Sequence, residues 1–144
     1  RCSKVFSKVV VAISKNPRKK PLYSLEKRIE FARKVLGNIK NIEIVHFEGL
    51  LVDMAEASNA QVIAKGLRAI SDFEYEFQMA LMNRRLYSKV ETVFLTPKEE
   101  YLYLSSRLVR EVVALGGDVA GLVPDPVRVR LEERYRKVTH PPTR

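Results

Sequence analysis

The chain has 144 residues and a formal net charge of +9, from 26 lysines and arginines against 17 aspartates and glutamates. This length is typical of one domain with its own core, and a composition of 46% hydrophobic and 30% charged residues excludes an intrinsically disordered chain. The longest apolar run, Val9–Ile13, is too short to cross a bilayer, and the single cysteine, Cys2, excludes an internal disulfide framework.

The positive charge is concentrated at the start of the chain. Residues 1–23 contain seven basic and no acidic side chains. Such a segment indicates a polyanionic partner, which can be a nucleic acid, a membrane surface or a phosphorylated small molecule. The absence of cysteine pairs and of a secretory signal predicts a cytoplasmic protein. Because the first residue is Arg1 and not Met, we expect the domain to be incomplete at its N-terminus.

In the first third of the chain, strands and helices are predicted to alternate. Lys8–Ile13 is a β-branched apolar run, which predicts a buried strand. After a loop bracketed by two prolines, Ser24 is placed to cap a helix over residues 25–36. Residues 42–47 alternate between apolar and polar, which predicts a second strand, and residues 50–58 predict a short amphipathic helix.

The alternation continues to the end of the chain. Residues 61–64 predict a brief strand, and Ser71 with Glu74 forms a capping box that opens a long helix to about Leu86. Phe73 and Phe77, one turn apart on this helix, are predicted to lie in the core. The remaining predicted elements are a strand at 91–95, a helix capped by Ser105 or Ser106 and ended by Gly116 and Gly117, and a last helix after Pro124 and Pro126.

This order predicts an α/β fold, a parallel sheet with helices on both faces, in a single domain over residues 1–144. In such sheets ligands bind beyond the carboxyl ends of the strands. Three of the four loops that follow predicted strands carry cationic side chains, at residues 14–23, 65–71 and 96–106. The sequence therefore predicts a pocket for phosphate groups at this edge of the sheet.

The most informative of these loops is Lys65-Gly66-Leu67-Arg68. Its glycine either adopts a positive φ or allows a ligand to approach the backbone closely, and the flanking cations can bind phosphate oxygens. An ordinary turn with two solvated cations explains the same residues equally well.

The other two loops carry the same ambiguity. Ser105 and Ser106 precede a helix, where hydroxyls and free amides form an anion site, although simple helix capping is the commoner role of serine there. Arg18, Lys19 and Lys20 form a phosphate clamp, a nucleic-acid patch or a solvated loop. Because no metal-ligand spacing and no nucleophile–base pair is found, positioned cations favour a direct in-line transfer between phosphates over a covalent intermediate.

Three stretches together resemble the bacterial phosphopantetheine adenylyltransferases. The sequence GLRAISDFEYEFQMA at residues 66–80 resembles the GLRA…D(F/Y)EYE…QMA signature of that family. NPRKKP at residues 16–21 resembles its Lys-Lys loop, and LSSRLVREV at residues 104–112 resembles its C-terminal serine motif. The resemblance runs in one register to about Leu131. It implies a Rossmann-like parallel sheet, Mg²⁺ as cofactor, a homohexamer, and transfer of adenylate from ATP to 4′-phosphopantetheine.

The resemblance also implies site residues. Lys19 and Arg68 are the implied catalytic residues, and Lys19, Leu51 and Lys65 would bind 4′-phosphopantetheine. Dephospho-coenzyme A would be the product, coenzyme A a feedback ligand, and neither a membrane nor a nucleic acid would be a partner. The residues that would bind ATP are Gly66, Leu67, Arg68, Glu76, Tyr101, Leu102, Tyr103, Leu104, Ser105, Ser106 and Arg107.

The sequence differs from the family pattern in three places. The family's first strand and its T-x-x-P-x-T-x-G-H motif have no counterpart in this sequence. Lys65 replaces the usual arginine, which keeps the charge but loses the planar fork, and Arg107 stands where serine or threonine is common. Two alternatives to the enzyme therefore remain: a basic nucleic-acid-binding module, and a nucleotide-binding remnant without catalysis.

Overall fold

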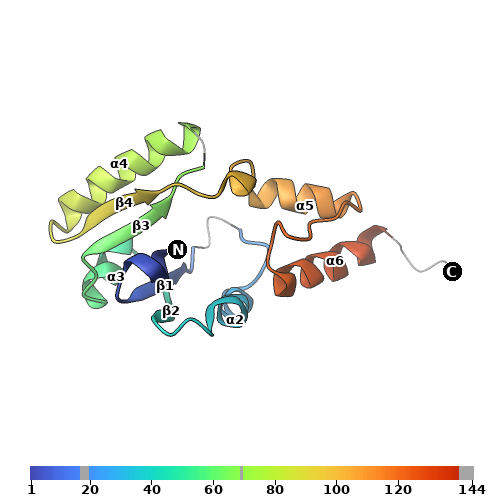
Figure 1. The fold of residues 1–144 in the computed structure, drawn as a ribbon, viewed down its shortest axis with the longest axis horizontal. Coiled ribbons are helices and arrows are strands. Elements are labelled where there is room, and N and C mark those ends of the chain that lie inside the picture. The colour runs from blue at the N-terminus through green and yellow to red at the C-terminus, as the bar shows by residue number, and fades with distance from the viewer. Residues whose placement is uncertain (17–19, 69, 140–144) are drawn as a thin grey trace. The chain divides into compact units, whose positions relative to one another are not determined.

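A computed structural model describes residues 1–16, 20–68 and 70–139, with the backbone alone for residues 70–72 and 136–139. Parallel strands alternate with helices, so the chain has the predicted α/β fold of the Rossmann-like kind (Figure 1). The chain divides into two compact units, residues 1–98 and residues 99–144, which are described separately below.

The first unit opens with α1 (Cys2–Val5), β1 (Val9–Ser14), α2 (Leu25–Leu36) and β2 (Ile42–Phe47). Strands β1 and β2 pair in parallel, with Val9 opposite Ile42. The predicted cap of α2 is confirmed, because the Ser24 hydroxyl accepts a hydrogen bond from the backbone amide of Lys27 at 3.3 Å. Arg28 of α2 donates to the carbonyl of Ser14 at 2.9 Å, which holds this helix to the end of β1.

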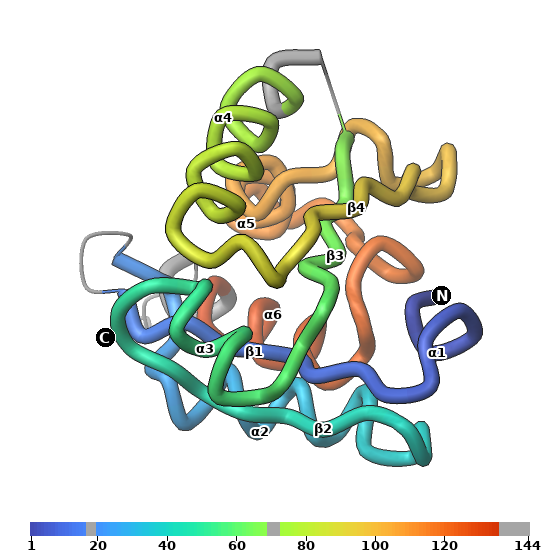
Figure 2. The backbone as a smooth tube through the Cα atoms, turned by 90° about the vertical axis from the view of Figure 1, so that its left-hand side faces the viewer, coloured from blue at the N-terminus to red at the C-terminus, as the bar shows by residue number. Residues whose placement is uncertain are grey.

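The unit continues with α3 (Leu51–Ala57), β3 (Val62–Gly66), α4 (Ile70–Leu86) and β4 (Glu91–Leu95). Figure 2 shows how the chain passes from β2 through α3 to β3. Strands β3 and β4 form a second parallel pair, with Val62 opposite Glu91. The predicted strand ended too early, because β3 includes Lys65 and Gly66, which the prediction placed in the following loop.

The described strands form two two-stranded sheets instead of one continuous sheet. No strand of the described residues pairs with the second edge of β1 or of β3. For this reason the prediction that Lys8–Ile13 is buried is wrong, since every residue of β1 is only half-buried. The core of the unit lies instead around α3 and β3, where Val52, Ala55, Ile63 and Val90 pack together.

Helix α4 also differs from the prediction. Phe73 and Phe77 stack on each other with ring centroids 5.7 Å apart, but their side chains remain 47% and 46% exposed, so they are not core residues. Tyr75, Leu81, Met82 and Leu86 are exposed on the same helix. The helix has apolar residues around most of its circumference, and its contacts with β4 and α3 cover only part of them.

The second unit contains the short 3₁₀ helix η2 (Glu99–Tyr101), α5 (Ser106–Ala114) and α6 (Asp125–Thr139). Ser105 is the residue that caps α5, since its hydroxyl accepts from the amide of Leu108 at 3.1 Å. The helix ends before Gly116, whose φ of +82° is a conformation that glycine adopts at little cost. Helices α5 and α6 pack through a small core of Val109, Val113, Val119 and Leu131. Throughout the described part of the chain, none of the helices is both long and apolar enough to cross a membrane.

Candidate functional site

The carboxyl end of the β3–β4 pair carries the residues on which the phosphate-site prediction rests. Lys65 and Gly66 are the last residues of β3, and the backbone amide of Leu67 donates to the carbonyl of Leu95 at 3.3 Å, which extends the ladder by one residue. Arg68 follows with an exposed side chain. The four residues therefore stand at the edge of a parallel pair where ligands bind in open α/β sheets.

The backbone conformation at position 66 does not require a glycine. It is not among the glycines with positive φ, which are Gly49, Gly116 and Gly121 among the described residues. A Cβ placed on Gly66 would meet no atom within 4 Å. The structure thus removes the conformational explanation of this glycine, and the close approach of a ligand stays a prediction.

An ion pair joins the end of β3 to α4. Lys65 Nζ lies 3.3 Å from Glu76 Oε2, and the two side chains are 33% and 25% exposed. Glu76 Oε2 is buried and accepts no hydrogen bond from the residues that the structure describes. This oxygen is thus paired with the Lys65 charge, without a hydrogen bond of good geometry, at the edge where a ligand is expected. No local pattern in the sequence pairs these two residues, which are eleven positions apart in different elements.

Leu51 and Lys65, both predicted to bind the substrate, line one cavity of about 540 Å³ in the first unit. Leu51 is the first residue of α3. The N-cap residue of this helix, Leu50, makes no side-chain hydrogen bond to it. The other cavity walls come from α1, β1 and β3. The fold therefore brings these two predicted residues together, although they belong to different elements.

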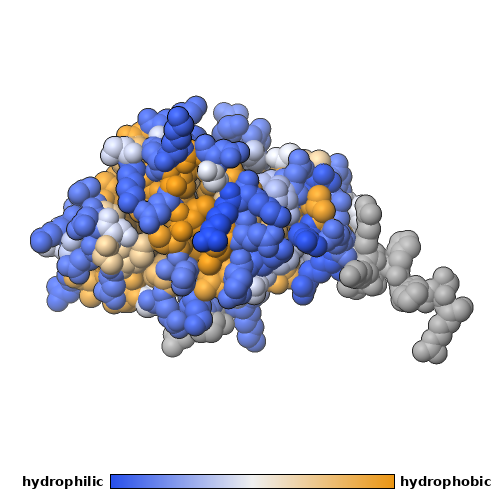
Figure 3. Space-filling model, turned by 90° about the horizontal axis from the view of Figure 1, so that it is seen from below, coloured by the Kyte–Doolittle hydropathy of each residue, from blue (hydrophilic) through white to orange (hydrophobic). Residues whose placement is uncertain are grey.

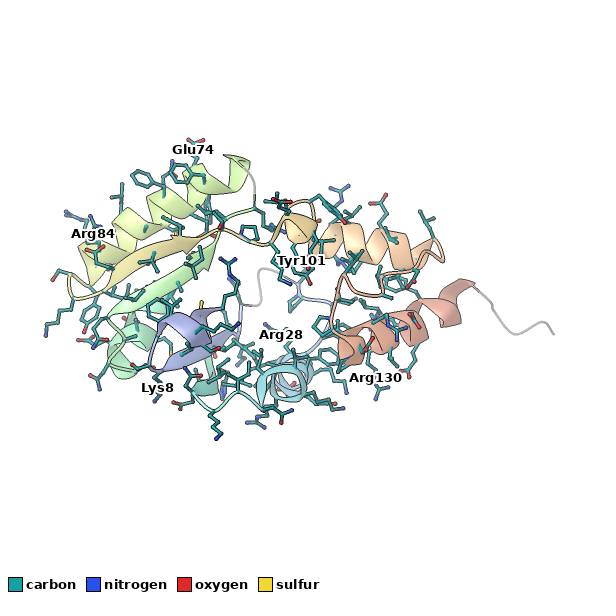
Figure 4. All side chains as sticks on the ribbon, viewed as in Figure 1. Lys8, Arg28, Glu74, Arg84, Tyr101 and Arg130 are labelled. Atoms are coloured by element: carbon teal, nitrogen blue, oxygen red, sulfur yellow. The ribbon has the colours of Figure 1, made fainter. Side chains whose placement is uncertain are left out.

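The other predicted ATP-binding residues belong to the second unit. Tyr101 lies in η2 and is labelled in Figure 4. Tyr101 and Leu104 are half-buried, whereas Leu102 and Tyr103 are 45% and 63% exposed. Ser105 performs the capping role that was the alternative to an anion site, and Ser106 is the first helical residue. Arg107 is exposed, so its charge is accessible to solvent.

Some predictions fall on residues that the structure does not describe. Arg18 and Lys19 of the basic loop are among these, and so is the side chain of Ser71 in the predicted capping box. Lys20, the next residue of the loop, is exposed with a φ of +39°. Glu74 is exposed and points away from β3 and β4 (Figure 4).

Metal-binding side chains are not clustered in the described residues, which hold no group of three or more His, Cys, Asp or Glu placed to share an ion. A protein cage for a cation is therefore not formed by this part of the chain. The site offers cations and one carboxylate, a set suited to phosphate groups and to a sugar or base.

Comparison with known proteins shows the family of this chain. A family model described as cytidylyltransferase-like matches residues 1–112. A phosphopantetheine adenylyltransferase of Carboxydothermus hydrogenoformans is 52% identical over 137 residues, which are 95% of this chain and 85% of the relative. The enzymes of the same name from Heliobacterium modesticaldum and Azoarcus sp. are 47% and 49% identical, over 94% and 93% of this chain and 80% and 82% of their own lengths. The chain therefore belongs to the cytidylyltransferase-like family and, within it, to the phosphopantetheine adenylyltransferases.

Proposed function

We propose that this chain transfers the adenylyl group of ATP to 4′-phosphopantetheine, in the biosynthesis of coenzyme A. The observation that carries the proposal is sequence identity: this chain is 47–52% identical, over 93–95% of its length, to proteins named phosphopantetheine adenylyltransferase. The cationic end of β3 supports it independently, because Lys65 and Arg68 stand where a parallel sheet binds phosphates.

In the proposed step, a terminal phosphate oxygen of 4′-phosphopantetheine attacks the α-phosphorus of ATP. The new P–O bond forms as the bond from the α-phosphorus to the bridging oxygen breaks, so dephospho-coenzyme A is formed and pyrophosphate leaves. The protein has little covalent chemistry to do in such a transfer, and it acts by positioning the two phosphates and neutralising their charge.

Each site residue receives a role in this proposal. Lys65 and Lys19 would bind the phosphate of 4′-phosphopantetheine, and Leu51 would contact its apolar part. Arg68 would hold ATP phosphates bidentately beside the accessible backbone of Gly66. Glu76 would contact adenosine, whose amino and hydroxyl groups are donors, through the carboxylate that is paired with Lys65. The second unit would contribute Tyr101–Arg107, with Ser105 and Ser106 as donors near the phosphates.

Magnesium is part of the proposal as the ion that ATP carries. Mg²⁺ is commonly bound through substrate phosphates and a few waters, so in this proposal phosphate oxygens would hold most of the ion. When bound, Mg²⁺ would neutralise charge on the phosphates, and Lys65 and Arg68 would bind the phosphate oxygens that it leaves open. Removal of divalent cations with EDTA is expected to abolish dephospho-coenzyme A formation and to be reversed by added Mg²⁺.

The test is formation of dephospho-coenzyme A from ATP, Mg²⁺ and 4′-phosphopantetheine. It is run with this chain and with a chimera to which the unmatched residues of the Carboxydothermus relative are restored. Arg68→Ala should lower kcat/KM about 10²–10³-fold, as the loss of other donors to a developing charge does. Arg85→Ala, an exposed cation in the last turn of α4, is the matched control and should leave activity unchanged. Absence of product from both proteins would overturn the proposal.

The same samples decide between the alternatives. A nucleotide-binding remnant would bind ATP in calorimetry without forming product in either protein. A nucleic-acid-binding module would bind RNA or DNA with a steep salt dependence. The comparisons give no support to the nucleic-acid alternative.

We also propose that the protein is a cytoplasmic homo-oligomer, with the hexamer as the expected form. The exposed apolar residues of α4, Phe73, Tyr75, Phe77, Leu81, Met82 and Leu86, support association, because a monomer rarely leaves so many on one helix. Sedimentation measurements test the state, and Leu81→Glu with Met82→Glu should shift it towards the monomer.

A further inference from the structure

Arg1 is a cation of the basic opening segment that the proposed function does not use. Its guanidinium donates a hydrogen bond from Nη1 to the backbone carbonyl of Thr96, the residue that follows β4. The two residues are 95 positions apart in the sequence, and both belong to the first unit. The position of the Arg1 side chain is therefore set by the fold and not by its neighbours in the chain.

The turn that carries Arg1 is itself held in place. Arg1 is the N-cap residue of α1, and its carbonyl accepts a hydrogen bond from the amide of Lys4 at 3.0 Å. At the other end of this turn, the side-chain amide of Asn41 donates to the carbonyls of Ser3 and Phe6 at 2.9 and 3.0 Å. Asn41 immediately precedes β2, so α1 is fixed to the β1–β2 sheet while the Arg1 side chain reaches the β3–β4 sheet.

The contact with Thr96 brings this guanidinium to the edge of the sheet where the phosphate site is proposed. The amide of Leu67 donates to the carbonyl of Leu95 at 3.3 Å, which continues the β3–β4 ladder one residue beyond β3. Thr96, the next residue, therefore lies beside Leu67 at the carboxyl end of this parallel pair, where ligands bind in open α/β sheets. Arg1 thus adds a cation to the edge that already carries Lys65.

The charge of Arg1 is less compensated than that of Lys65. Lys65 Nζ lies 3.3 Å from Glu76 Oε2, whereas Arg1 forms no ion pair with a carboxylate of the residues that the structure describes. A guanidinium has five N–H donors, and one of those of Arg1 is used by Thr96. The planar arrangement of the others fits two oxygens of one phosphate group. Arg1 is therefore an anchored cation with donors to offer at the proposed phosphate edge.

We propose that Arg1 is a further phosphate-binding residue, which contacts the triphosphate of ATP together with Arg68. This rests on the proposed function, because that function brings ATP to the end of β3. The triphosphate is the assigned ligand because Thr96 lies beside Leu67, between the two residues, Gly66 and Arg68, to which the proposed function assigns the ATP phosphates. The bond to Thr96 also reduces the side-chain entropy that a long arginine loses when it binds a ligand.

The test compares the binding of ATP and of adenosine by calorimetry. It is run with this chain and with the chimera to which the unmatched residues of the Carboxydothermus relative are restored. Arg1→Gln removes the charge and should raise the Kd for ATP at least about tenfold, as expected for the loss of a charge-assisted hydrogen bond. The Kd for adenosine, which has no phosphate group, should stay within about twofold, because the guanidinium donors are assigned to phosphate oxygens.

Two further variants separate a phosphate contact from a structural role. Lys4→Gln is the matched control, because Lys4 is an exposed cation of the same turn, and it should leave the Kd for ATP within about twofold. Arg1→Lys keeps the charge and loses the planar fork, so it should recover most of the ATP affinity that Arg1→Gln loses. Thermal unfolding of each variant establishes that the fold is retained before binding is compared.

The outcomes separate this proposal from the proposed function, because no readout involves catalysis. A loss of ATP affinity in Arg1→Gln that Arg1→Lys largely recovers, with adenosine binding unchanged, supports the proposal even if no dephospho-coenzyme A is ever formed. Equal weakening of ATP and adenosine binding overturns it, since Arg1 would then act on the structure of the site. Weaker binding of 4′-phosphopantetheine alone overturns it too, and so does ATP binding that Arg1→Gln leaves unchanged or that neither protein shows.

Discussion

Replacing Gly66 with alanine separates the structural from the ligand-binding role of this residue. The residue ends β3 without a positive φ, and an added Cβ would contact no atom of the protein within 4 Å. Gly66→Ala is therefore expected to stabilise the folded chain by about 0.4–1 kcal/mol, since alanine loses less backbone entropy on folding. For a chain of this size, that corresponds to a Tm increase of roughly 1–4 °C.

The same methyl group is expected to weaken ATP binding. If phosphates approach the backbone of Gly66 as proposed, the Cβ occupies space that the ligand needs. Such overpacking costs about 1–3 kcal/mol, or roughly 5- to 150-fold in the Kd for ATP. Calorimetry of ATP binding and thermal unfolding of the same samples measure the two effects separately.

Gly121→Ala is the matched control for this experiment. Gly121 also has open space around its Cβ position, but its φ of +76° makes alanine strained. This variant should lower the Tm and leave the Kd for ATP unchanged, so both measurements distinguish it from Gly66→Ala. If Gly66→Ala is more stable yet binds ATP as tightly as the unchanged chain, then no ligand approaches Gly66 and the reasoning fails.

Three further predictions concern stability. Val90 is 1% exposed and packs in the cluster around α3 and β3. Val90→Ala should lower the free energy of unfolding in urea by ~2–3 kcal/mol, because two methyl groups are lost and a cavity is left. A loss below half that amount would mean that the cluster is not a core. Ser105→Ala removes the cap of α5 and should cost ~1 kcal/mol, whereas Ser105→Asp should restore it. Hydrogen bonds from Lys27 and Lys34 lower the pKa of Glu30 from 4.5 to about 2. A carboxyl whose pKa is lowered on folding stabilises the protein above its unfolded pKa. The Tm of Glu30→Gln should therefore lie below that of the unchanged chain by the full amount at pH 7, by less below pH 4.5 and by nothing near pH 2. A Tm difference that does not change with pH would contradict this.

The elements predicted correctly are those with local signals. The bounds of α2, β2 and β4 agree with the prediction, because a serine cap and apolar periodicity define them within the segment itself. Ser105 was one of two candidates for the cap of α5, and the structure selects it. That Lys65 and Arg68 stand at the carboxyl end of a parallel strand was also predictable, although Lys65 belongs to the strand itself and not to the loop after it.

The predictions that failed depended on partners elsewhere in the fold. Phe73 and Phe77 have the spacing of a core stripe, but whether a helix face is covered depends on what packs against it. The apolar run of β1 has the composition of a central strand, yet its burial depends on a neighbour at its second edge. The two sheets share one cavity between these edges, which neither strand's sequence could indicate.

The charge of the basic opening segment, residues 1–23, also depends on partners elsewhere in the fold. Lys8 Nζ lies 2.8 Å from Glu43 Oε2, and Lys15 Nζ lies 3.0 Å from Glu48 Oε2 (Figure 4 labels Lys8). Both carboxylates come from β2 or the residue after it, because parallel pairing with β1 brings these distant segments side by side. Two of the seven cations of this segment, Lys8 and Lys15, are thus paired with carboxylates in the fold.

These ion pairs weaken the nucleic-acid interpretation of the net charge. A binding surface for a phosphate backbone needs several cations free to replace counterions, and its salt dependence grows with their number. Hydrophilic side chains surround patches of apolar surface on the face that the space-filling view shows (Figure 3). The proposal that phosphates bind at Lys65 and Arg68 needs no such surface, because these cations stand at a strand end beside the accessible backbone of Gly66.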